Sequence, residues 1–127
     1  MIDHQGPTWP RGRRLHERLV VVGRRGEEIA ARFLTERGAR IVGRNVRVGR
    51  DEIDLLLDID GKRVVAEVKT ATDNGSSPRP EENFDENKAT RIRRAARNLD
   101  TPVQRIDLVT VVIGVDGVAV RWLPGVG

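Results

Sequence analysis

The sequence predicts one small α/β domain, in which helices flank a mixed β-sheet in the order αβββαββ. Two segments carry apolar residues at helical spacing, and five shorter segments rich in aliphatic residues are typical of strands. Of the 127 residues 38% are hydrophobic but only 3% are aromatic, so Val, Ile, Leu and Ala must build the core. Such a core suits a small layered fold, and the length fits a single domain over residues 15–127.

The chain is expected to begin with an arm that lies outside this domain. Residues 1–14 hold prolines, glycines and arginines without apolar periodicity, which predicts a disordered basic arm. Residues 15–37 then follow helical spacing, and Gly38 ends the helix. One stripe of this helix surrounds a single acid with small and apolar residues, namely Val20, Gly23, Glu27, Ala30, Ala31 and Leu34. Its small residues, such as Gly23, predict a close approach to the sheet.

Three strands are predicted next, over residues 39–48, 52–58 and 63–70. Asp60-Gly61, a hairpin dipeptide, joins the last two, so we expect an antiparallel meander. Residues 73–82 are rich in Asp, Asn, Gly, Ser and Pro, which predicts a mobile loop.

The second half of the chain repeats the helix-to-strand pattern. Residues 85–99 predict a helix with a narrow apolar stripe, and Pro102 follows it. Strands over residues 106–113 and 118–122 surround Asp116-Gly117, which predicts a second hairpin.

Several classes of site are excluded by composition. The chain has no cysteine, which excludes disulfides, iron–sulfur clusters and thiolate zinc sites. Its histidines, His4 and His16, lie in the first sixteen residues and leave none for a catalytic triad or a His-rich metal site. No apolar run of about 18 residues is present, so we expect a cytoplasmic protein without a membrane span. Metal chemistry would have to use carboxylates.

The basic residues are strongly skewed toward arginine. Of 23 basic residues 20 are Arg, and the three lysines are Lys62, Lys69 and Lys88. Arginine suits phosphate binding, which favours an anionic polymer as ligand, while a GC-rich coding background would give the same skew. Composition alone leaves both interpretations open.

The most informative stretch lies in the second and third predicted strands. Strand alternation predicts that Glu52 and Asp54 share one face, with Ile53, Leu55 and Leu57 on the other. In the next strand Val65, Glu67 and Lys69 share a face. Lys69 could simply pair with Asp54 or Glu67, but three acids against one lysine leave a surplus of negative charge. A divalent cation with oxygen ligands, Mg²⁺ or Mn²⁺, would balance it.

Each predicted helix adds one charged residue to this stretch. Glu27 lies in the middle of the apolar stripe of the first helix, so it needs a partner: the cluster, or an ordinary ion pair with Arg24 or Arg44. Lys88 lies four residues before Ile92, on the side of the second helix that carries its apolar stripe. Its ammonium either reaches the cluster or a phosphate, or extends to water from the helix start.

These residues resemble the D…ExK core of the PD-(D/E)xK nuclease superfamily, the fold of restriction endonucleases and archaeal Holliday-junction resolvases. More closely, blocks of the chain in the same order resemble the YraN-like family of small, largely uncharacterised bacterial proteins. These blocks are Gly26-Glu27-Glu28-Ile29-Ala30-Ala31, Arg44-Asn45, Glu52-Ile53-Asp54-Leu55, Glu67-Val68-Lys69, Lys88 and Arg105-Ile106-Asp107-Leu108-Val109. Together they cover about residues 23–112.

The resemblance implies a restriction endonuclease-like, three-layer core and a metal site. Asp54 and Glu67 would be metal ligands for Mg²⁺ or Mn²⁺, Lys69 the catalytic lysine, and Glu27 a helix-borne acid that completes the catalytic set. Resolvase-like folds commonly act as dimers, so the resemblance also implies a homodimer. The block with Arg105 and Asp107 is a family signature to which no role is assigned.

One position departs from the family pattern. The family commonly has Gly before Glu-Ile-Asp, whereas Asp51 stands there in this chain. Strand alternation sends its side chain to the face opposite Glu52.

The sequence therefore predicts a metal-dependent nuclease that hydrolyses phosphodiester bonds in DNA, branched or junction DNA included, with DNA favoured over RNA. Lys88, Arg91 and Arg94 are expected to bind the nucleic-acid backbone, and Glu52 to support the site from outside the ligand set. The alternative is a nucleic-acid-binding module with a nuclease-like fold and no catalysis. A third interpretation is an adaptor whose acidic face only binds a cation.

Overall fold

The computed structural model describes residues 13–72 and 85–126, with side chains from residue 21 onward. Its elements follow the predicted order αβββαββ. They are α1 (Arg13–Glu36), β1 (Arg40–Val48), β2 (Asp51–Ile59), β3 (Lys62–Thr72), α2 (Glu86–Arg97), β4 (Arg105–Ile113) and β5 (Val118–Leu123).

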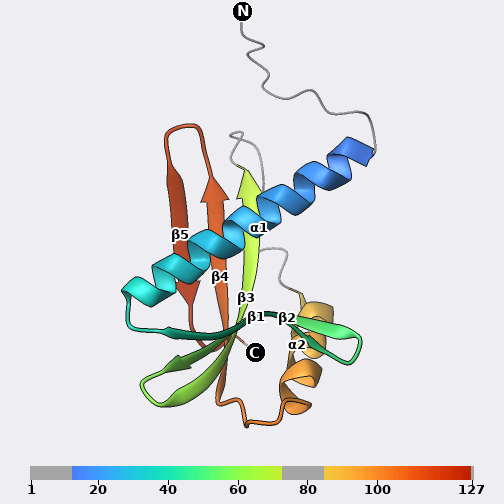
Figure 1. Cartoon of the computed structure of the whole chain (residues 1–127), viewed down its shortest axis with the longest axis vertical. Helices are drawn as coiled ribbons and strands as arrows, with labels where there is room; N and C mark the ends of the chain where they lie inside the picture. Colours follow the sequence, from blue (N-terminus) through green and yellow to red (C-terminus); the bar gives the residue numbers. More distant parts are fainter. Residues whose placement is uncertain (1–12, 73–84, 127) are drawn as a thin grey trace, which may run out of the picture.

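The strands form one mixed sheet in the order β1-β2-β3-β4-β5 (Figure 1). β1, β2 and β3 pair antiparallel, which confirms the predicted meander. β3 and β4 pair in parallel, and α2 lies in the long connection that a parallel pair requires. β4 and β5 close the sheet with the predicted antiparallel hairpin.

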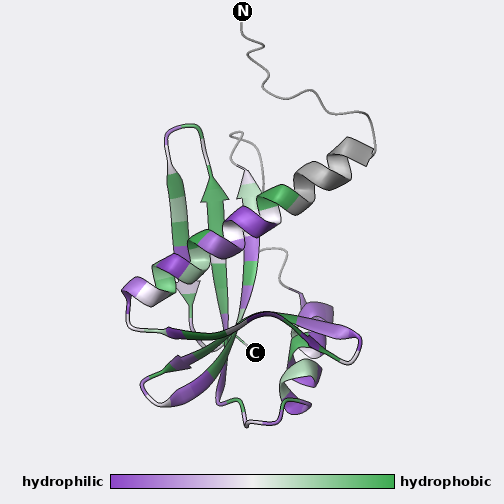
Figure 2. Cartoon of the chain, viewed as in Figure 1, coloured by the Kyte–Doolittle hydropathy of each residue, from purple (hydrophilic) through white to green (hydrophobic). Residues whose placement is uncertain are grey.

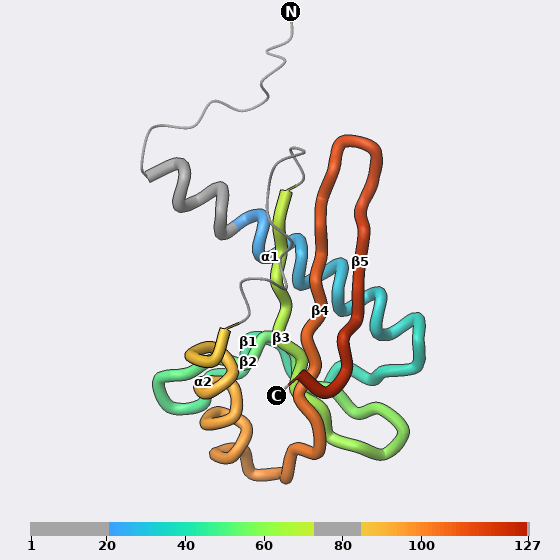
Figure 3. The backbone as a smooth tube through the Cα atoms, turned by 180° about the vertical axis from the view of Figure 1, so that it is seen from behind, coloured from blue at the N-terminus to red at the C-terminus, as the bar shows by residue number. Residues whose placement is uncertain are grey.

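The two helices cover different faces of the sheet and so create two apolar cores. α1 crosses one face and packs mainly on β3 and β4, while α2 lies beside β2 on the other (Figures 1 and 3). The α1 core holds Leu34, Leu55, Leu57, Val64, Val109 and Val111 among others, and the α2 core holds Ile53, Leu56, Val65, Ile92, Ala95 and Ile106. β4, between β3 and β5, is largely hydrophobic (Figure 2). The three-layer arrangement is the predicted one.

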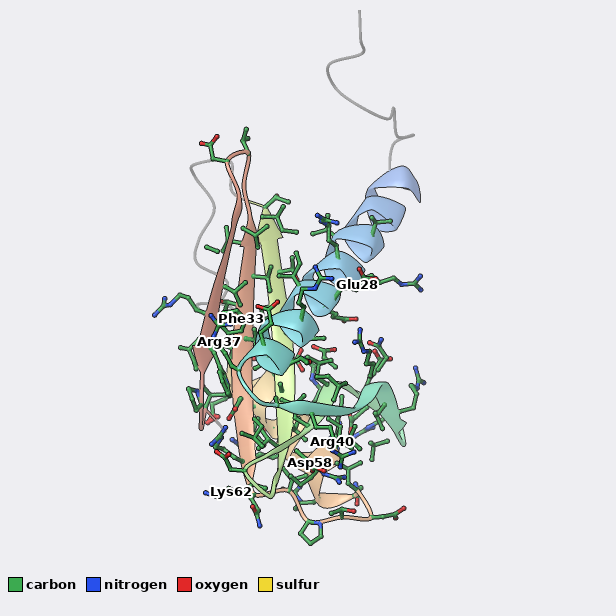
Figure 4. All side chains as sticks on the ribbon, turned by 60° about the vertical axis from the view of Figure 1, so that its left-hand side comes forward. Glu28, Phe33, Arg37, Arg40, Asp58 and Lys62 are labelled. Carbon is green, nitrogen blue, oxygen red and sulfur yellow. The ribbon has the colours of Figure 1, made fainter. Side chains whose placement is uncertain are left out.

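α1 ends as the sequence predicts. Gly38 adopts φ 96°, its N–H donates to Thr35 O at 3.1 Å, and the Ala39 N–H donates to Leu34 O at 3.0 Å. This pair of bonds satisfies the last carbonyls of a helix and needs a residue that tolerates positive φ. Beside it the Arg37 guanidinium stacks on the Phe33 ring at 3.5 Å from its centre (Figure 4).

The glycine that lets α1 approach the sheet is Gly26, and the expectation for Gly23 was wrong. A Cβ added at Gly26 would collide with the Thr70 side chain of β3, whereas a Cβ at Gly23 would meet no atom within 4 Å. Ala30 and Ala31 are buried one turn later, as predicted. The helix therefore crosses the sheet closest near the middle of its length, next to Glu27.

β2 changes partners along its length, which corrects the prediction that Ile53, Leu55 and Leu57 share a face. Its pairing with β3 runs from Ile59 back to Leu55 and stops there, while its pairing with β1 continues to Asp51. Beyond the split, Ile53 joins the α2 core, whereas Leu55 and Leu57 lie in the α1 core. A strand held from only one side is free to twist more strongly, so strict alternation fails at the split.

Several element boundaries differ from the predicted ones by a few residues. α1 already begins at Arg13, inside the predicted arm, and α2 begins at Glu86 with Asp85 as its N-cap, which accepts a bond from the Lys88 N–H at 3.0 Å. The rest of the predicted arm and the predicted loop over residues 73–82 lie outside the described residues. Neither described helix is long and apolar enough to cross a membrane.

Asp107 fastens the C-terminal segment to β4. Its side chain is fully buried and accepts two bonds from Arg105, at 2.8 and 2.9 Å, one from Trp122 Nε1 at 2.8 Å and one from the Gly125 N–H at 3.0 Å. These donors saturate the carboxylate. The signature pair Arg105 and Asp107, to which the sequence assigned no role, is therefore part of the fold's framework.

Candidate functional site

The candidate site lies where β2 leaves β3. The Asp54 carboxylate accepts a bond from the Val68 N–H at 2.8 Å, on the strand from which β2 has just separated. This bond holds Asp54 beside Glu67, and the two carboxyl groups are hydrogen-bonded to each other. Lys69 Nζ lies 3.4 Å from Glu67 Oε1. The structure thus brings together the three residues of the D…ExK pattern.

Burial makes this acid pair hard to ionise. The Glu67 side chain is only 15% exposed, and burial followed by the Asp54 charge raises the pKa of Glu67 to about 7. Burial also raises the pKa of Asp54, against the opposing effect of its bond from Val68. The ion pair with Lys69 expected as an alternative is present, but it does not balance two carboxylates.

α1 adds a third acid from the opposite side of the split. The pKa of Glu27 is raised, first by burial and then by the Asp54 charge. Its hydrogen-bond partner is the Asn45 amide of β1. With the amide assigned so that its nitrogen faces the acids, the orientation that satisfies both carboxylates, Asn45 Nδ2 lies 3.2 Å from Glu27 Oε1 and 3.2 Å from Glu52 Oε1 and donates to both. The expected alternative partner Arg24 contributes the weakest of the effects on Glu27. Asn45 belongs to the Arg44-Asn45 block, but its link to the acids was not predicted.

α2 brings a second lysine to the site. Lys88 lies in contact with Lys69, and burial followed by this neighbour lowers the pKa of Lys88. The capping bond from the Lys88 N–H to Asp85 fixes where the helix begins, and hence where this side chain emerges.

Pockets open on both sides of the acid pair. One of about 210 Å³ is lined by Arg50, Asp51, Glu52, Glu67, Lys69, Lys88, Arg91 and Ile92. The other, of about 300 Å³, is lined by Arg24, Glu27, Glu28, Arg44, Asn45, Asp54 and Leu55. We call them the lysine pocket and the α1 pocket. Because Glu67 lines the first and Asp54 the second, the pair forms a wall between them.

Arg94 and Asp51 form an ion pair with two hydrogen bonds. Arg94 Nε and Nη2 donate to the two Asp51 oxygens at 2.9 and 2.8 Å, which ties α2 to the start of β2. This forked pair holds the pKa of Asp51 low. Asp51 also lines the same pocket as Glu52, so the alternation that placed them on opposite faces fails at the strand end next to the turn. Of the residues expected to bind nucleic acid, Lys88 and Arg91 line the lysine pocket.

The donor set suits a hard divalent cation. All candidate ligands are carboxylate oxygens, and when both members of the pair are ionised Lys69 neutralises only one of the two charges. Within residues 13–72 and 85–126 no three acidic or histidine side chains converge as a complete metal cage. Mg²⁺ is commonly held by one or two carboxylates, with water and substrate oxygens as further ligands, so Asp54 and Glu67 fit it.

The sequence matches a protein family described as "Uncharacterised protein family UPF0102" over residues 26–111. A UPF0102 protein of Solibacter usitatus (strain Ellin6076) is 36% identical over 111 residues, which cover 81% of this chain and 83% of the relative. One of Arthrobacter sp. (strain FB24) is 38% identical over 114 residues, covering 84% and 96%. One of Paenarthrobacter aurescens (strain TC1) is 43% identical over 101 residues, covering 72% and 80%.

Proposed function

The chain belongs to the uncharacterised protein family UPF0102, the YraN-like proteins, and we propose that it is a metal-dependent nuclease that hydrolyses phosphodiester bonds in DNA. The observation that carries the proposal is the half-buried Asp54–Glu67 pair, which Lys69 contacts and which cationic side chains surround. The carboxylates can bind a metal ion and the neighbouring lysines can bind an anion, so the site suits a phosphate that contacts both.

Asp54 and Glu67 would hold Mg²⁺ or Mn²⁺. When bound, such a cation activates a water molecule and offsets charge on the scissile phosphate. Because burial raises the pKa of Glu67 to about 7, the acid pair without a divalent cation would keep a proton near neutrality, and a bound cation would displace that proton. Glu27 and Glu52 would support the site from beyond the ligand pair.

Lys69 would act on the reacting groups. Its ammonium lies at the Glu67 carboxylate, where it can orient the attacking water and stabilise negative charge that develops on the phosphate. As the water oxygen bonds to phosphorus it releases a proton to solvent, and the bond from phosphorus to the leaving oxygen breaks, so that this oxygen takes up a proton from solvent. A compact ammonium suits this position better than a guanidinium, which is consistent with a lysine in an arginine-rich chain.

The cationic side chains of the lysine pocket would bind the DNA backbone. Lys88 and Arg91 come from α2, and Arg50 comes from the turn between β1 and β2. Since Arg94 is occupied by Asp51, the proposal assigns phosphate contacts to Lys88 and Arg91 and omits Arg94. Contacts of this kind position a backbone without reading its sequence.

The alternative is a nucleic-acid-binding module without catalysis. The acid pair argues against it, because carboxylates that face the lysine pocket would repel a phosphate unless a cation lies between them. Binding that needs no divalent cation, without cleavage, would favour this alternative.

A cleavage assay tests the proposal. Labelled linear, flapped and four-way DNA is incubated with Mg²⁺ or Mn²⁺ and with wild-type protein, Glu67→Gln or Lys69→Met. We expect the wild type to cut at least one substrate and each variant to lose about 100-fold or more in rate. Lys62→Met is the matched control, since Lys62 is exposed at the other end of β3. A wild type that cuts none of the substrates, or variants that cut as fast, would contradict the proposal.

A further inference from the structure

Asn45 has an unusual backbone conformation for a residue inside a strand. Its φ is 51°, in the left-handed region, and among the described residues only one other non-glycine residue, Asp60, shares a positive φ. Asp60 lies in the hairpin turn between β2 and β3, where the turn itself requires that conformation. No turn requires it at Asn45, which lies in the middle of β1. Strain of this kind persists where the surrounding structure imposes it, and it often accompanies functional sites.

The conformation places the Asn45 amide among the acids of the site. The pairs Arg44 with Leu55 and Val46 with Ile53 set Asn45 opposite Asp54, at the point where β2 leaves β3. In the amide orientation that satisfies its neighbours, the Asn45 nitrogen donates from there to Glu27 Oε1 of α1 and to Glu52 Oε1 of β2, at 3.2 Å each. One side chain therefore links α1, β1 and β2 in the lining of the α1 pocket.

A neutral donor has a specific advantage at this position. The amide has two N–H hydrogens, and each serves one carboxylate. An arginine or lysine would hold the same carboxylates but would cancel charge that a cation could use. Asn45 fixes two mutually repelling acids and leaves their negative charge in place, facing Asp54.

We infer that Asn45 is a positioning residue that holds Glu27 and Glu52 as acceptors for the water around a cation bound by Asp54 and Glu67. The inference rests on the proposed metal site. Mg²⁺ and Mn²⁺ commonly keep water in their shells, and side chains that hydrogen-bond from outside the ligand set typically change metal affinity 10–100-fold.

Asn45→Gly tests the inference, because glycine accepts the left-handed backbone and lacks only the amide. The matched control is Asp60→Gly, which makes the same kind of replacement at the other left-handed position, away from the site. Mn²⁺ affinity is measured by calorimetry and the Mn²⁺ environment by electron paramagnetic resonance. We expect Asn45→Gly to keep the circular dichroism of the wild type, to bind Mn²⁺ at least about tenfold more weakly and to change the resonance spectrum, while Asp60→Gly binds as the wild type does.

The outcomes separate this inference from the proposed function. Wild-type affinity in Asn45→Gly would overturn the role of Asn45 and leave the nuclease proposal standing. Loss of the folded spectrum in Asn45→Gly would assign Asn45 to the framework of the fold and would also overturn the inference. A wild-type protein that binds no Mn²⁺ would overturn the proposed metal site itself.

Discussion

Two sets of acids in the same sheet, Asp107 and the pair Asp54 and Glu67, differ in how many hydrogen-bond donors surround them. Asp107 of β4 is fully buried and receives four hydrogen bonds, two of them from a guanidinium. On the neighbouring strands, Asp54 accepts one backbone bond, from the Val68 N–H, and Glu67 has one lysine, Lys69, at 3.4 Å. Both groups are held by the same sheet, and both are largely shielded from water.

What differs is the number of hydrogen-bond donors that contact the carboxylate oxygens. A carboxylate whose oxygens are saturated with hydrogen bonds has no need of a cation and stabilises the fold, as Asp107 does between β4 and the C-terminal segment. A buried pair with too few donors keeps a proton instead, and the pKa of Glu67 is raised to about 7. Such a pair is poised to exchange that proton for a cation, which is why the candidate site lies at the β2–β3 split and not at Asp107.

The largest effect is expected at the saturated acid. Asp107→Asn keeps the shape but removes the charge that Arg105 needs, and breaking a buried ion pair costs about 3–5 kcal/mol of unfolding free energy. Urea unfolding followed by circular dichroism measures this loss. Asp58→Asn, at a partly exposed acid that pairs with Arg40 and Arg63, is the control and should cost much less (Figure 4).

Equal stability of Asp107→Asn and the wild type would contradict the contrast between Asp107 and the Asp54–Glu67 pair, because Asp107 would then not stabilise the fold. The substitution should also leave Mn²⁺ binding intact under conditions in which the variant is folded.

The second prediction concerns the pH dependence of stability that arises from Asp54 and Glu67, the pair with few hydrogen-bond donors. Without divalent cations, folded Glu67 keeps its proton up to about pH 7, whereas the unfolded chain releases it near 4.5. Between these values the folded state binds more protons, so the free energy of unfolding falls as pH rises from about 4.5 to 7. The expected contribution is on the order of 3 kcal/mol, since the pKa rises from 4.5 to about 7 and each pKa unit corresponds to about 1.4 kcal/mol.

Urea unfolding at a series of pH values in the presence of a chelator measures this slope. Glu67→Gln should flatten it, since an amide does not titrate, and saturating Mn²⁺ should flatten it in the wild type, since the cation replaces the Glu67 proton in the folded state. A slope that is the same in wild type and Glu67→Gln would show that this pair does not hold the proton.

The smallest effect is expected at Asp51, an acid that lines the lysine pocket but is fully occupied by Arg94. Asp51→Gly restores the residue that the family commonly has there. We expect a smaller loss of stability than in Asp107→Asn and an unchanged Mn²⁺ affinity, because donor supply and not proximity to the pocket defines the site. Calorimetry on the variant checks this, and a large loss of Mn²⁺ affinity would count Asp51 among the site's acids.

The sequence predicted the elements well because each has a local cause. Asp60-Gly61 and Gly38 make their turns without help from the rest of the chain, and apolar spacing locates the helices. It also predicted that Asp54, Glu67 and Lys69 come together, since adjacent strands joined by a tight hairpin have their register fixed by the turn.

The features that were missed depend on contacts between distant segments. The end of the β2–β3 pairing at Leu55 moves Ile53 to the other core, and no local pattern marks it. Likewise, whether Gly23 or Gly26 faces β3 depends on where α1 crosses the sheet. The left-handed Asn45 and the Arg94–Asp51 pair arise from the same tertiary geometry.

Titration of the protein with Mn²⁺ in a calorimeter tests the central claim most directly, with wild type, Asp54→Asn and Asp58→Asn compared at one pH. Asp54 and Asp58 are both acids of β2, but Asp58 forms ion pairs with two arginines. We predict that the wild type and Asp58→Asn bind Mn²⁺ alike and that Asp54→Asn loses the binding. Unchanged binding in Asp54→Asn, or equal loss in both variants, would contradict the claim that Asp54 and Glu67, the acids with few hydrogen-bond donors at the β2–β3 split, form the metal site.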